Sequence, residues 1–379
     1  MRAESYLSRV WIFSLFIASL ACGPLIESQR PSYGLRKVSL RLLDDDYDRL
    51  VDKGWSKNKV FAHFKIQGKI YPIEIGYSGK TSIDSIKRNY KFTFKRGHTF
   101  QGHTHYRLSG QPSDETGLRS LAGFYSFKVF GFETPDIEPV SLYINNKYKG
   151  IYYLIEPVDE DFFRLRGIKL QSLYKAQLGN ATFSLDNISQ PQRGWSEKNG
   201  TSKSYEELLL LLKTLHYDKQ NLADILDIQD YIRYIAAAAF IGHCDGFRNN
   251  FYIYTEHKED KFKFIPWDLD RCVFDNIVAV NQKEQLFGNE TSLSSFIFSQ
   301  QTYLDKHKES MCSLISILKE NNLLRDHVTK QASAIKEAFT HDSQRQIETP
   351  SFEDNYQKFL QQLDQRFQVY ESHPSLLCL

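Results

Sequence analysis

Residues 243–270 read HCDGFRNNFYIYTEHKEDKFKFIPWDLD. Two apolar runs, Phe251–Tyr254 and Phe262–Pro266, predict short strands joined by a charged turn. Because a hairpin brings its two outer ends together, we expect the polar residues that flank the strands to meet. His243–Asn250 has the pattern H-x-D-x4-N, and Trp267–Asp270 has the pattern W-D-x-D.

This order of residues resembles the catalytic core of protein kinases, in which a loop aspartate precedes a hairpin and a metal-binding aspartate. Phosphoryl transfer needs positioned reactants and neutralised charge, and Mg²⁺ or Mn²⁺ prefers oxygen ligands. We therefore expect Asp245 to orient or deprotonate an acceptor hydroxyl, and Asn250 and Asp268 to hold metal ions on ATP. Asp270 is an alternative metal ligand. The pattern H-x-D-x4-N also arises by chance, and a lone aspartate near a helix end is more often a helix cap.

The second half of the chain is predicted to be mainly helical. Asp227 can cap a helix over residues 228–241, whose four consecutive alanines allow close packing in the interior. Apolar residues also recur at helical spacing over residues 205–215, 302–345 and 352–371. Residues 179–200 are rich in Asn, Ser, Gln and Gly, so we expect a surface insertion there.

The first half predicts a half-buried antiparallel sheet with one long helix. Apolar and polar residues alternate, or apolar residues form short runs, over residues 38–42, 60–66, 71–75, 90–94, 141–144 and 151–156. Residues 116–130 have helical spacing and end before Gly131, and Asp159 can cap a short helix that reaches about Arg166. Strands followed by helices predict an α+β fold.

The amino terminus has the features of a secretion signal. Arg2 and Arg9 precede about 12 apolar or small residues, which is too short for a transmembrane helix of about 20. We expect residues 1–21 to be a signal peptide and residues 22–35 to be a tether. Cys22 follows a sequence that resembles a bacterial lipobox, so a lipid on this cysteine would attach the protein to a membrane. Simple secretion is the alternative.

Composition describes a folded protein without a polyanion-binding signature. Lys and Arg total 48 and Asp and Glu total 46, which gives a net charge of +2, so a nucleic-acid partner is not expected. Without Cys22, four cysteines remain that an exported protein could pair, and Cys244 and Cys272 bracket the expected site. The cysteine spacing does not match a structural zinc site.

Three histidines lie close together in sequence, in the segment RGHTFQGHTHYR. His98, His103 and His105 have no cysteine or carboxylate near them in sequence, so we expect an exposed histidine loop rather than a metal site.

The chain also resembles the CotH family of spore-coat and secreted protein-kinase-like proteins. The resemblance lies in residues 79–82, 87–94, 142–156, 173–175, 243–254 and 267–270. It implies an atypical kinase-like fold with a sheet-rich amino-terminal lobe over residues 36–158 and a helical carboxyl-terminal lobe over residues 159–379. It further implies binding of ATP with Mg²⁺ or Mn²⁺, and phosphorylation of Ser or Thr hydroxyls on exported proteins.

The resemblance assigns roles residue by residue. Asp245 matches the catalytic aspartate of the family and Asp268 its metal-binding aspartate. Lys91 or its rival Lys175 would contact the phosphates, and Glu156 ends the hairpin where backbone groups would take the adenine. The family usually has an arginine where this chain has Ser78, a departure that bears on nucleotide affinity. The alternative function is a non-catalytic adhesion or coat-assembly protein on the same fold.

Overall fold

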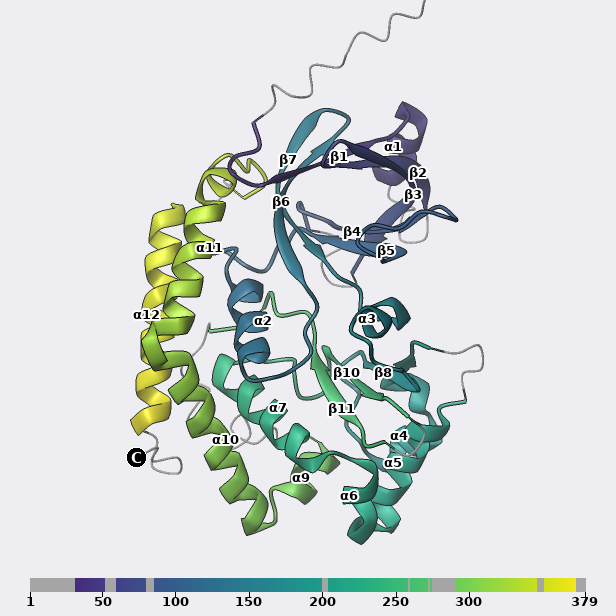
Figure 1. The fold of residues 1–379 in the computed structure, drawn as a ribbon, viewed down its shortest axis with the longest axis vertical. Coiled ribbons are helices and arrows are strands. Elements are labelled where there is room, and N and C mark those ends of the chain that lie inside the picture. Colours follow the sequence, from purple (N-terminus) through teal and green to yellow (C-terminus); the bar gives the residue numbers. More distant parts are fainter. Residues whose placement is uncertain are drawn as a thin grey trace, which may run out of the picture.

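A barrel of strands lies at one end of the molecule and a mainly helical part at the other (Figure 1). The structure is a computed structural model that describes residues 31–51, 59–79, 85–199, 204–257, 260–271, 273–274, 291–345 and 351–372. The expected α+β class is confirmed, with strands concentrated before residue 156 and helices after it.

Seven strands close the barrel in the order β1-β2-β3-β4-β5-β7-β6. They are β1 (Arg36–Arg41), β2 (Val60–Ile66), β3 (Lys69–Ser78), β4 (Asn89–Phe94), β5 (His105–Ser109), β6 (Ile137–Ile144) and β7 (Lys147–Ile155). The closing pair, β1 and β6, is parallel, whereas the other neighbours are antiparallel. The sequence predicts an antiparallel sheet and gives no sign of this closure, because it joins Val38 to Leu142, about a hundred residues later.

Alternating side chains fill the barrel. In β2, Val60, Ala62, Phe64 and Ile66 are buried, whereas Phe61 and His63 between them are exposed. The ring of Phe64 stacks on that of Phe92 with 4.8 Å between centroids. Because inward and outward residues alternate along a strand, the period-two pattern in the sequence identifies the barrel interior.

A second, four-stranded sheet has the order β11-β10-β8-β9. Its strands are β8 (Ser172–Ala176), β9 (Trp195–Glu197), β10 (Phe251–Thr255) and β11 (Lys263–Pro266). The expected β10–β11 hairpin is confirmed. The surface insertion predicted over residues 179–200 is wrong, since this segment supplies the edge strand β9 and buries Trp195 completely. The segment is polar in composition, but it contains the buried aromatic residues Phe183 and Trp195.

The helices form most of the remaining structure. They are α1 (Asp44–Val51), α2 (Arg119–Val129), α3 (Glu160–Leu165), α4 (Leu185–Ser189), α5 (Glu206–Tyr217), α6 (Leu222–Ile225), α7 (Ile228–Ile241), α9 (Ser292–Ile297), α10 (Gln301–Lys319), α11 (Leu323–Thr340) and α12 (Phe352–Ser372). Asp227 caps α7 by accepting a hydrogen bond from the Asp230 N–H at 2.9 Å. Helices α11 and α12 run side by side along one edge of the molecule (Figure 1). Among these described helices, none combines the length and apolarity that a bilayer crossing requires.

The end of α11 is fastened to the barrel through buried charges. Asp342 pairs with Lys87, which is 3% exposed, and accepts a hydrogen bond from the Ile151 N–H at 3.1 Å. Arg345 donates to the carbonyl oxygens of Gly110 and Gln111 at 2.8 and 3.2 Å. Residues that are more than 190 positions apart therefore complete one another's hydrogen bonds.

Some expectations concern residues that the structure does not describe. The signal peptide over residues 1–21, the lipidated Cys22 and most of the tether over 22–35 lie outside the described residues, and so does Cys272. Cys244 and Cys312 are both disulfide-bonded.

Candidate active site

The loop after α7 is held in one conformation. Gly242 ends the helix with a φ of 74°, and the Gly246 and Asn249 N–H groups donate to the carbonyl oxygens of His243 and Asp245. The Tyr234 hydroxyl donates to the Gly246 carbonyl at 2.8 Å, and a Cβ at Gly246 would collide with the imidazole of His243. Asp245 therefore projects, half-buried, from a loop that is anchored on both sides.

Asn250 and Asp268 meet at the same end of the β10–β11 hairpin. The Trp267 N–H donates to the Asn250 carbonyl at 3.0 Å, next to the pair formed by Phe251 and Pro266. Asn250 and Asp268 have φ values of 55° and 56°, a left-handed conformation that Asn and Asp adopt more readily than most residues. The hairpin thus brings Asn250 and Asp268 to the same end, as the sequence predicts. The left-handed backbone at these two residues changes the direction in which each side chain leaves the chain.

Asp268 lies between two cations from different sheets. The Arg107 Nη1 on β5 donates to Asp268 Oδ1 at 3.1 Å. Burial works in the opposite direction, but the charges of Arg107 and Lys175 hold the pKa of Asp268 below its ordinary value. Arg107 belongs to the barrel and Asp268 to the second sheet, so this ion pair spans the junction of the two parts.

Lys175 is half-buried on β8, with its ammonium beside two aromatic rings. Its Nζ lies 5.5 Å from the ring centroid of Tyr252 and 5.0 Å from that of Trp267. Burial lowers the pKa of Lys175 to about 7, although the charge of Asp268 acts to raise it. An anion arriving at this position would therefore meet a cation that water solvates poorly.

Asp270 shares its surroundings with Asp268. Burial, followed by the negative charge of Asp268, raises the pKa of Asp270 to about 7. Two carboxylates this close resist simultaneous ionisation unless a cation joins them. The pair thus provides two oxygen-donor groups that a divalent cation would neutralise.

A small pocket opens between the barrel and the helical part at this point. Its lining includes Ser109, Gln111, Trp267, Asp268 and Asp270, and the space between these side chains is partly open to solvent and too narrow to hold a water molecule as it stands. The side-chain amide of Gln111 and the indole nitrogen of Trp267 are buried and have no hydrogen-bond partner among the described residues. Because buried polar atoms rarely lack partners, these groups could satisfy a ligand for which the lining side chains moved apart.

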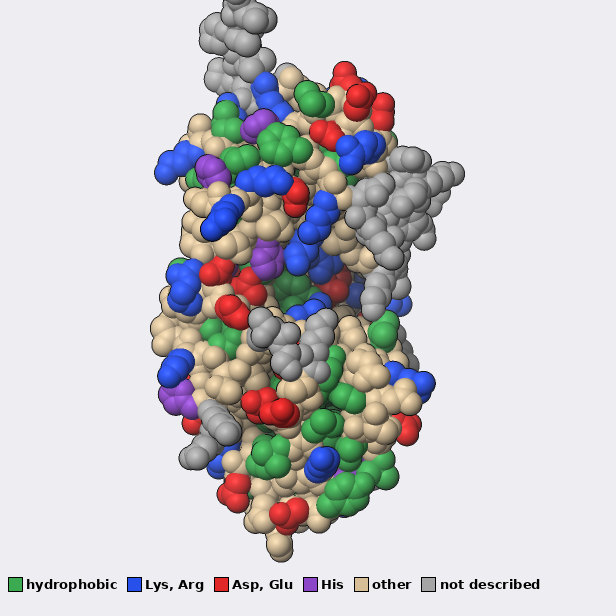
Figure 2. Space-filling model, turned by 90° about the vertical axis from the view of Figure 1, so that its right-hand side faces the viewer, with side chains coloured by type: hydrophobic (Ala, Val, Ile, Leu, Met, Phe, Trp, Pro, Cys, Tyr) green, Lys and Arg blue, Asp and Glu red, His purple; other side chains and the backbone are tan. Residues whose placement is uncertain are grey.

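On the face turned toward the viewer in Figure 2, a hollow crosses the middle of the molecule, bordered by basic, acidic and histidine side chains. Lys91 is exposed on β4, paired in register with Arg107 of β5, and its positive charge contributes to lowering the pKa of Lys175. Lys91 and Lys175, the two lysines expected to contact phosphates, are therefore close enough for their charges to interact. It gives Lys175 the closer association with Asp268.

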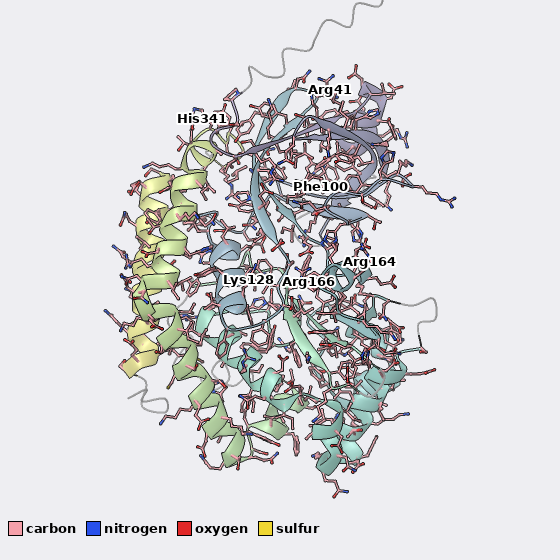
Figure 3. The ribbon with its side chains drawn as sticks, viewed as in Figure 1. Arg41, Phe100, Lys128, Arg164, Arg166 and His341 are labelled. Carbon is pink, nitrogen blue, oxygen red and sulfur yellow. The ribbon has the colours of Figure 1, made fainter. Side chains whose placement is uncertain are left out.

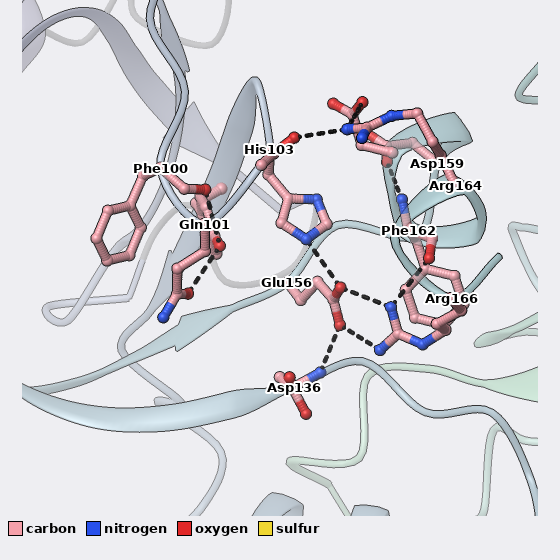
Figure 4. Close-up of polar contacts among 12 residues, drawn as sticks. Phe100, Gln101, His103, Asp136, Glu156, Asp159, Phe162, Arg164 and Arg166 are labelled. Carbon is pink, nitrogen blue, oxygen red and sulfur yellow. Dashed lines mark hydrogen bonds and ion pairs between the residues drawn. The ribbon is translucent and has the colours of Figure 1, made fainter.

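Glu156 lies in a different cluster, at the end of β7. Its carboxylate accepts from Arg166 at 2.7 and 2.8 Å, from His103 Nε2 at 2.8 Å and from the Asp136 N–H at 2.9 Å (Figure 4). Burial alone would raise its pKa, but these partners lower it to about 2. Figure 3 shows Arg166 and the neighbouring Arg164 at the junction of the two parts. The carboxylate of Glu156 is thus fully hydrogen-bonded within the protein. The contact expected between adenine and the backbone at this residue stays a prediction.

The expectation of an exposed histidine loop over residues 98–105 is wrong for His103. His98 is exposed, but His103 is only 3% exposed and lies against carboxylates from α3 and β7. These carboxylates are more than 50 residues away in sequence, so the residues next to His103 in sequence could not indicate them.

The sequence interpretation also missed Arg107 and Gln111, which lie on and just after β5. Tyr106-Arg107-Leu108 alternates between apolar and polar residues, and this short signal could have identified the strand.

The sequence of the chain matches that of a known class of proteins. The sequence model of the family described as "CotH kinase protein" matches residues 75–371, and the chain belongs to this family. The inner spore coat protein H of Bacillus subtilis strain 168 is 26% identical over 227 residues. That alignment covers 57% of this chain and 63% of the relative, so the chain spans less than two thirds of that protein.

A solved structure, the complex of HipA, HipB and operator DNA from a Shewanella oneidensis MR-1 toxin–antitoxin system, contains a chain with 13% identity. The match covers 74% of this chain and 58% of that chain with a TM-score of 0.30, which is too weak to inform the fold.

Proposed function

We propose that this protein is an ATP-dependent kinase that transfers the γ-phosphoryl group to Ser or Thr hydroxyls of exported proteins. The observation that carries the proposal is the pocket at the junction, where Asp268, Asp270 and unpartnered polar atoms of Gln111 and Trp267 come together. Membership of a family described as kinase proteins supports the same chemistry.

The residues present fit a nucleotide with Mg²⁺ or Mn²⁺. Asn250, Asp268 and Asp270 offer only oxygen ligands, which suit a hard divalent cation, and the bound cation would neutralise phosphate charge. Lys175 and Arg107 supply the positive charge for the phosphates, with Lys91 as the rival lysine. Asp245 accepts the proton of the acceptor hydroxyl from its anchored loop.

The proposal extends to the division of the chain. Residues 36–158 act as the amino-terminal lobe and residues 159–379 as the carboxyl-terminal lobe of a kinase-like protein, with nucleotide between them. The backbone of the segment from Glu156 to Val158 acts as the hinge that takes the adenine. The Arg107–Asp268 ion pair, which joins the two parts, supports this arrangement.

We also propose export, with residues 1–21 as the signal peptide and Cys22 as the lipidated residue that holds the protein at a bacterial envelope. The relative from Bacillus subtilis is named an inner spore coat protein, which supports a location outside the cytoplasm and coat or envelope proteins as substrates. The same name favours a second candidate, a non-catalytic protein of coat assembly.

The test is incubation of the purified protein with γ-labelled ATP, Mg²⁺ or Mn²⁺ and candidate envelope proteins. We expect label in the parent, and a loss of about 10²–10⁴-fold in Asp245→Ala, the range for removing a general base. Asp260→Ala, at an exposed position in the turn of the same β10–β11 hairpin, is the matched control and should keep full activity. Circular dichroism checks the fold of each variant.

Two outcomes would count against the proposal. Equal labelling by Asp245→Ala and the parent would contradict the assignment of this residue. A well-folded parent that binds nucleotide but transfers no label to any acceptor would favour the coat-assembly function.

A further inference from the structure

His103 is buried at a fixed position in the turn that precedes β5. Its backbone N–H and carbonyl exchange hydrogen bonds with Phe100 at 3.0 and 3.1 Å, and its side chain is 3% exposed. The imidazole therefore has little freedom to rotate out of the protein. Its surroundings come from the β7–α3 connection and from α3 itself, not from its own turn.

One ring nitrogen of His103 is committed and the other is not. Nε2 lies 2.8 Å from Glu156 Oε1, and Glu156 is an acceptor because Arg166 pairs with it through two N–H groups. Nε2 then carries a hydrogen, and in the neutral imidazole Nδ1 has the lone pair that a metal ion would take. Nδ1 is buried and has no partner among the described residues, and it points toward Asp159 (Figure 4).

Two carboxylates lie close to the imidazole of His103. One ligand atom each from His103, Asp159 and Asp161 lie within 4.8 Å of one another. Nδ1 of His105 lies 3.3 Å from Asp159 Oδ2 but does not belong to this group of three, so water would supply the fourth ligand of a tetrahedral cation. Ligands of a tetrahedral cation at about 2.1 Å stand about 3.4 Å apart, so binding requires an inward movement on the order of 1 Å.

The Glu156–His103 hydrogen bond has the form found behind metal-ligating histidines, where a carboxylate accepts from the second ring nitrogen and orients the ring. Without a ligand, the buried Nδ1 lone pair is left unsatisfied, which costs free energy. Arg164 Nη2 donates to Asp161 Oδ1 and to the Gly102 carbonyl, both at 2.8 Å, and Thr104 donates to Asp161 Oδ2 at 3.2 Å, so a cation at Asp161 would compete with these exposed contacts.

We propose that His103, Asp159 and Asp161 form a binding site for a divalent transition-metal cation, of which Zn²⁺ is the best match, separate from the Asp268 cluster. Mixed nitrogen and carboxylate donors favour Zn²⁺, whereas Mg²⁺ prefers oxygen alone. A bound cation would tie the turn before β5 to the start of α3, across the junction of the barrel and the helical part.

The experiment is a Zn²⁺ titration of the purified, untagged chain, after chelator treatment and with Mg²⁺ in excess to occupy oxygen-only sites. We expect one Zn²⁺ per chain and at least a tenfold weaker affinity in Asp161→Asn and His103→Gln. His98→Gln removes an exposed histidine of the same segment and should leave the affinity unchanged. Substitution by Co²⁺ should give the intense visible absorption of a four-coordinate site in the parent.

Asp161→Asn keeps the test decisive if His103→Gln fails to fold, because Asp161 is at the surface, with its side chain 21% exposed. The proposal would be overturned if the parent bound no Zn²⁺ under these conditions. It would also be overturned if Asp161→Asn bound Zn²⁺ as tightly as His98→Gln. None of these measurements uses ATP, so failure of the kinase proposal would not affect the outcome.

Discussion

The two carboxylate clusters at the junction of the barrel and the helical part differ in how completely the protein satisfies them. Glu156 is 5% exposed, and both of its oxygens accept hydrogen bonds from Arg166 and from other groups. Asp268 is 32% exposed in its side chain and has one contact with Arg107, while its neighbour Asp270 resists ionisation. The oxygens of Glu156 all have partners within the protein, whereas those of Asp268 and Asp270 can still bind a cation.

This difference separates structural from ligand-binding acids. A carboxylate whose partners are all supplied by the fold has no reason to exchange them, and its loss leaves other buried charges unmatched. A pair of carboxylates that repel each other gains free energy when a cation arrives.

The largest expected effect is on stability. Glu156→Gln removes the anion between Arg166 and His103 and should reduce the free energy of unfolding by about 3 kcal/mol, the lower end of the range for a broken buried ion pair. Glu133 still pairs with Arg166 at 3.1 Å, which limits the loss. Asp268→Asn, the matched change in the other cluster, should cost less than about 1 kcal/mol. Urea unfolding measures both, and equal losses would remove the distinction.

A second effect concerns the pH dependence of nucleotide binding. Lys175 has a pKa of about 7 in the free protein, and a phosphate beside it would raise that value, so binding takes up a proton above pH 7. The dissociation constant of ADP should therefore increase about fivefold between pH 7 and pH 8. Calorimetry at the two pH values measures it. Lys175→Arg keeps its charge over this range and should show no such increase; the same increase in the variant would assign it to another group.

A third effect is a change in the slope of stability against pH. Asp270 has a pKa of about 7 in the folded protein and an ordinary value near 3.8 when unfolded, so the folded state keeps a proton that the unfolded chain loses. Stability should fall as pH rises through this window, by at most about 1.4 kcal/mol per pH unit.

Asp270→Asn should flatten this slope in metal-free buffer, as measured by urea unfolding between pH 5 and pH 7. Glu156, whose pKa is lowered to about 2, contributes in the opposite sense, and its stabilisation is lost as pH falls from its ordinary value of 4.5 through about 2. An unchanged slope in Asp270→Asn would show that this carboxyl titrates normally.

The sequence predicts those parts of the fold that depend on neighbouring residues. The strand alternation of Val60–Ile66, the Asp227 cap and the β10–β11 hairpin are local, and the structure confirms all three. Closure of the barrel depends on Val38 finding Leu142, and the burial of Trp195 depends on β8. Periodicity over a short window contains no information about such partners.

The candidate site divides in the same way. Asp245, Asn250 and Asp268 come from one stretch of chain, so their spacing revealed the motif. Arg107 and Gln111 reach the same pocket from the barrel, and the carboxylates beside His103 come from α3 and β7. Only the tertiary structure joins them, because each is an ordinary polar residue in its own sequence context.

The attachment of α11 to the barrel affects the order in which the chain can fold. Lys87 is buried just before the barrel strand β4, and its partner Asp342 is synthesised 255 residues later. Until then, a closed barrel would enclose an unmatched ammonium group, and the carbonyl oxygens of Gly110 and Gln111 would lack the bonds that Arg345 supplies. The barrel is therefore the first part to be made and among the last to be completed, and a fragment that ends before residue 342 should not reach the native state.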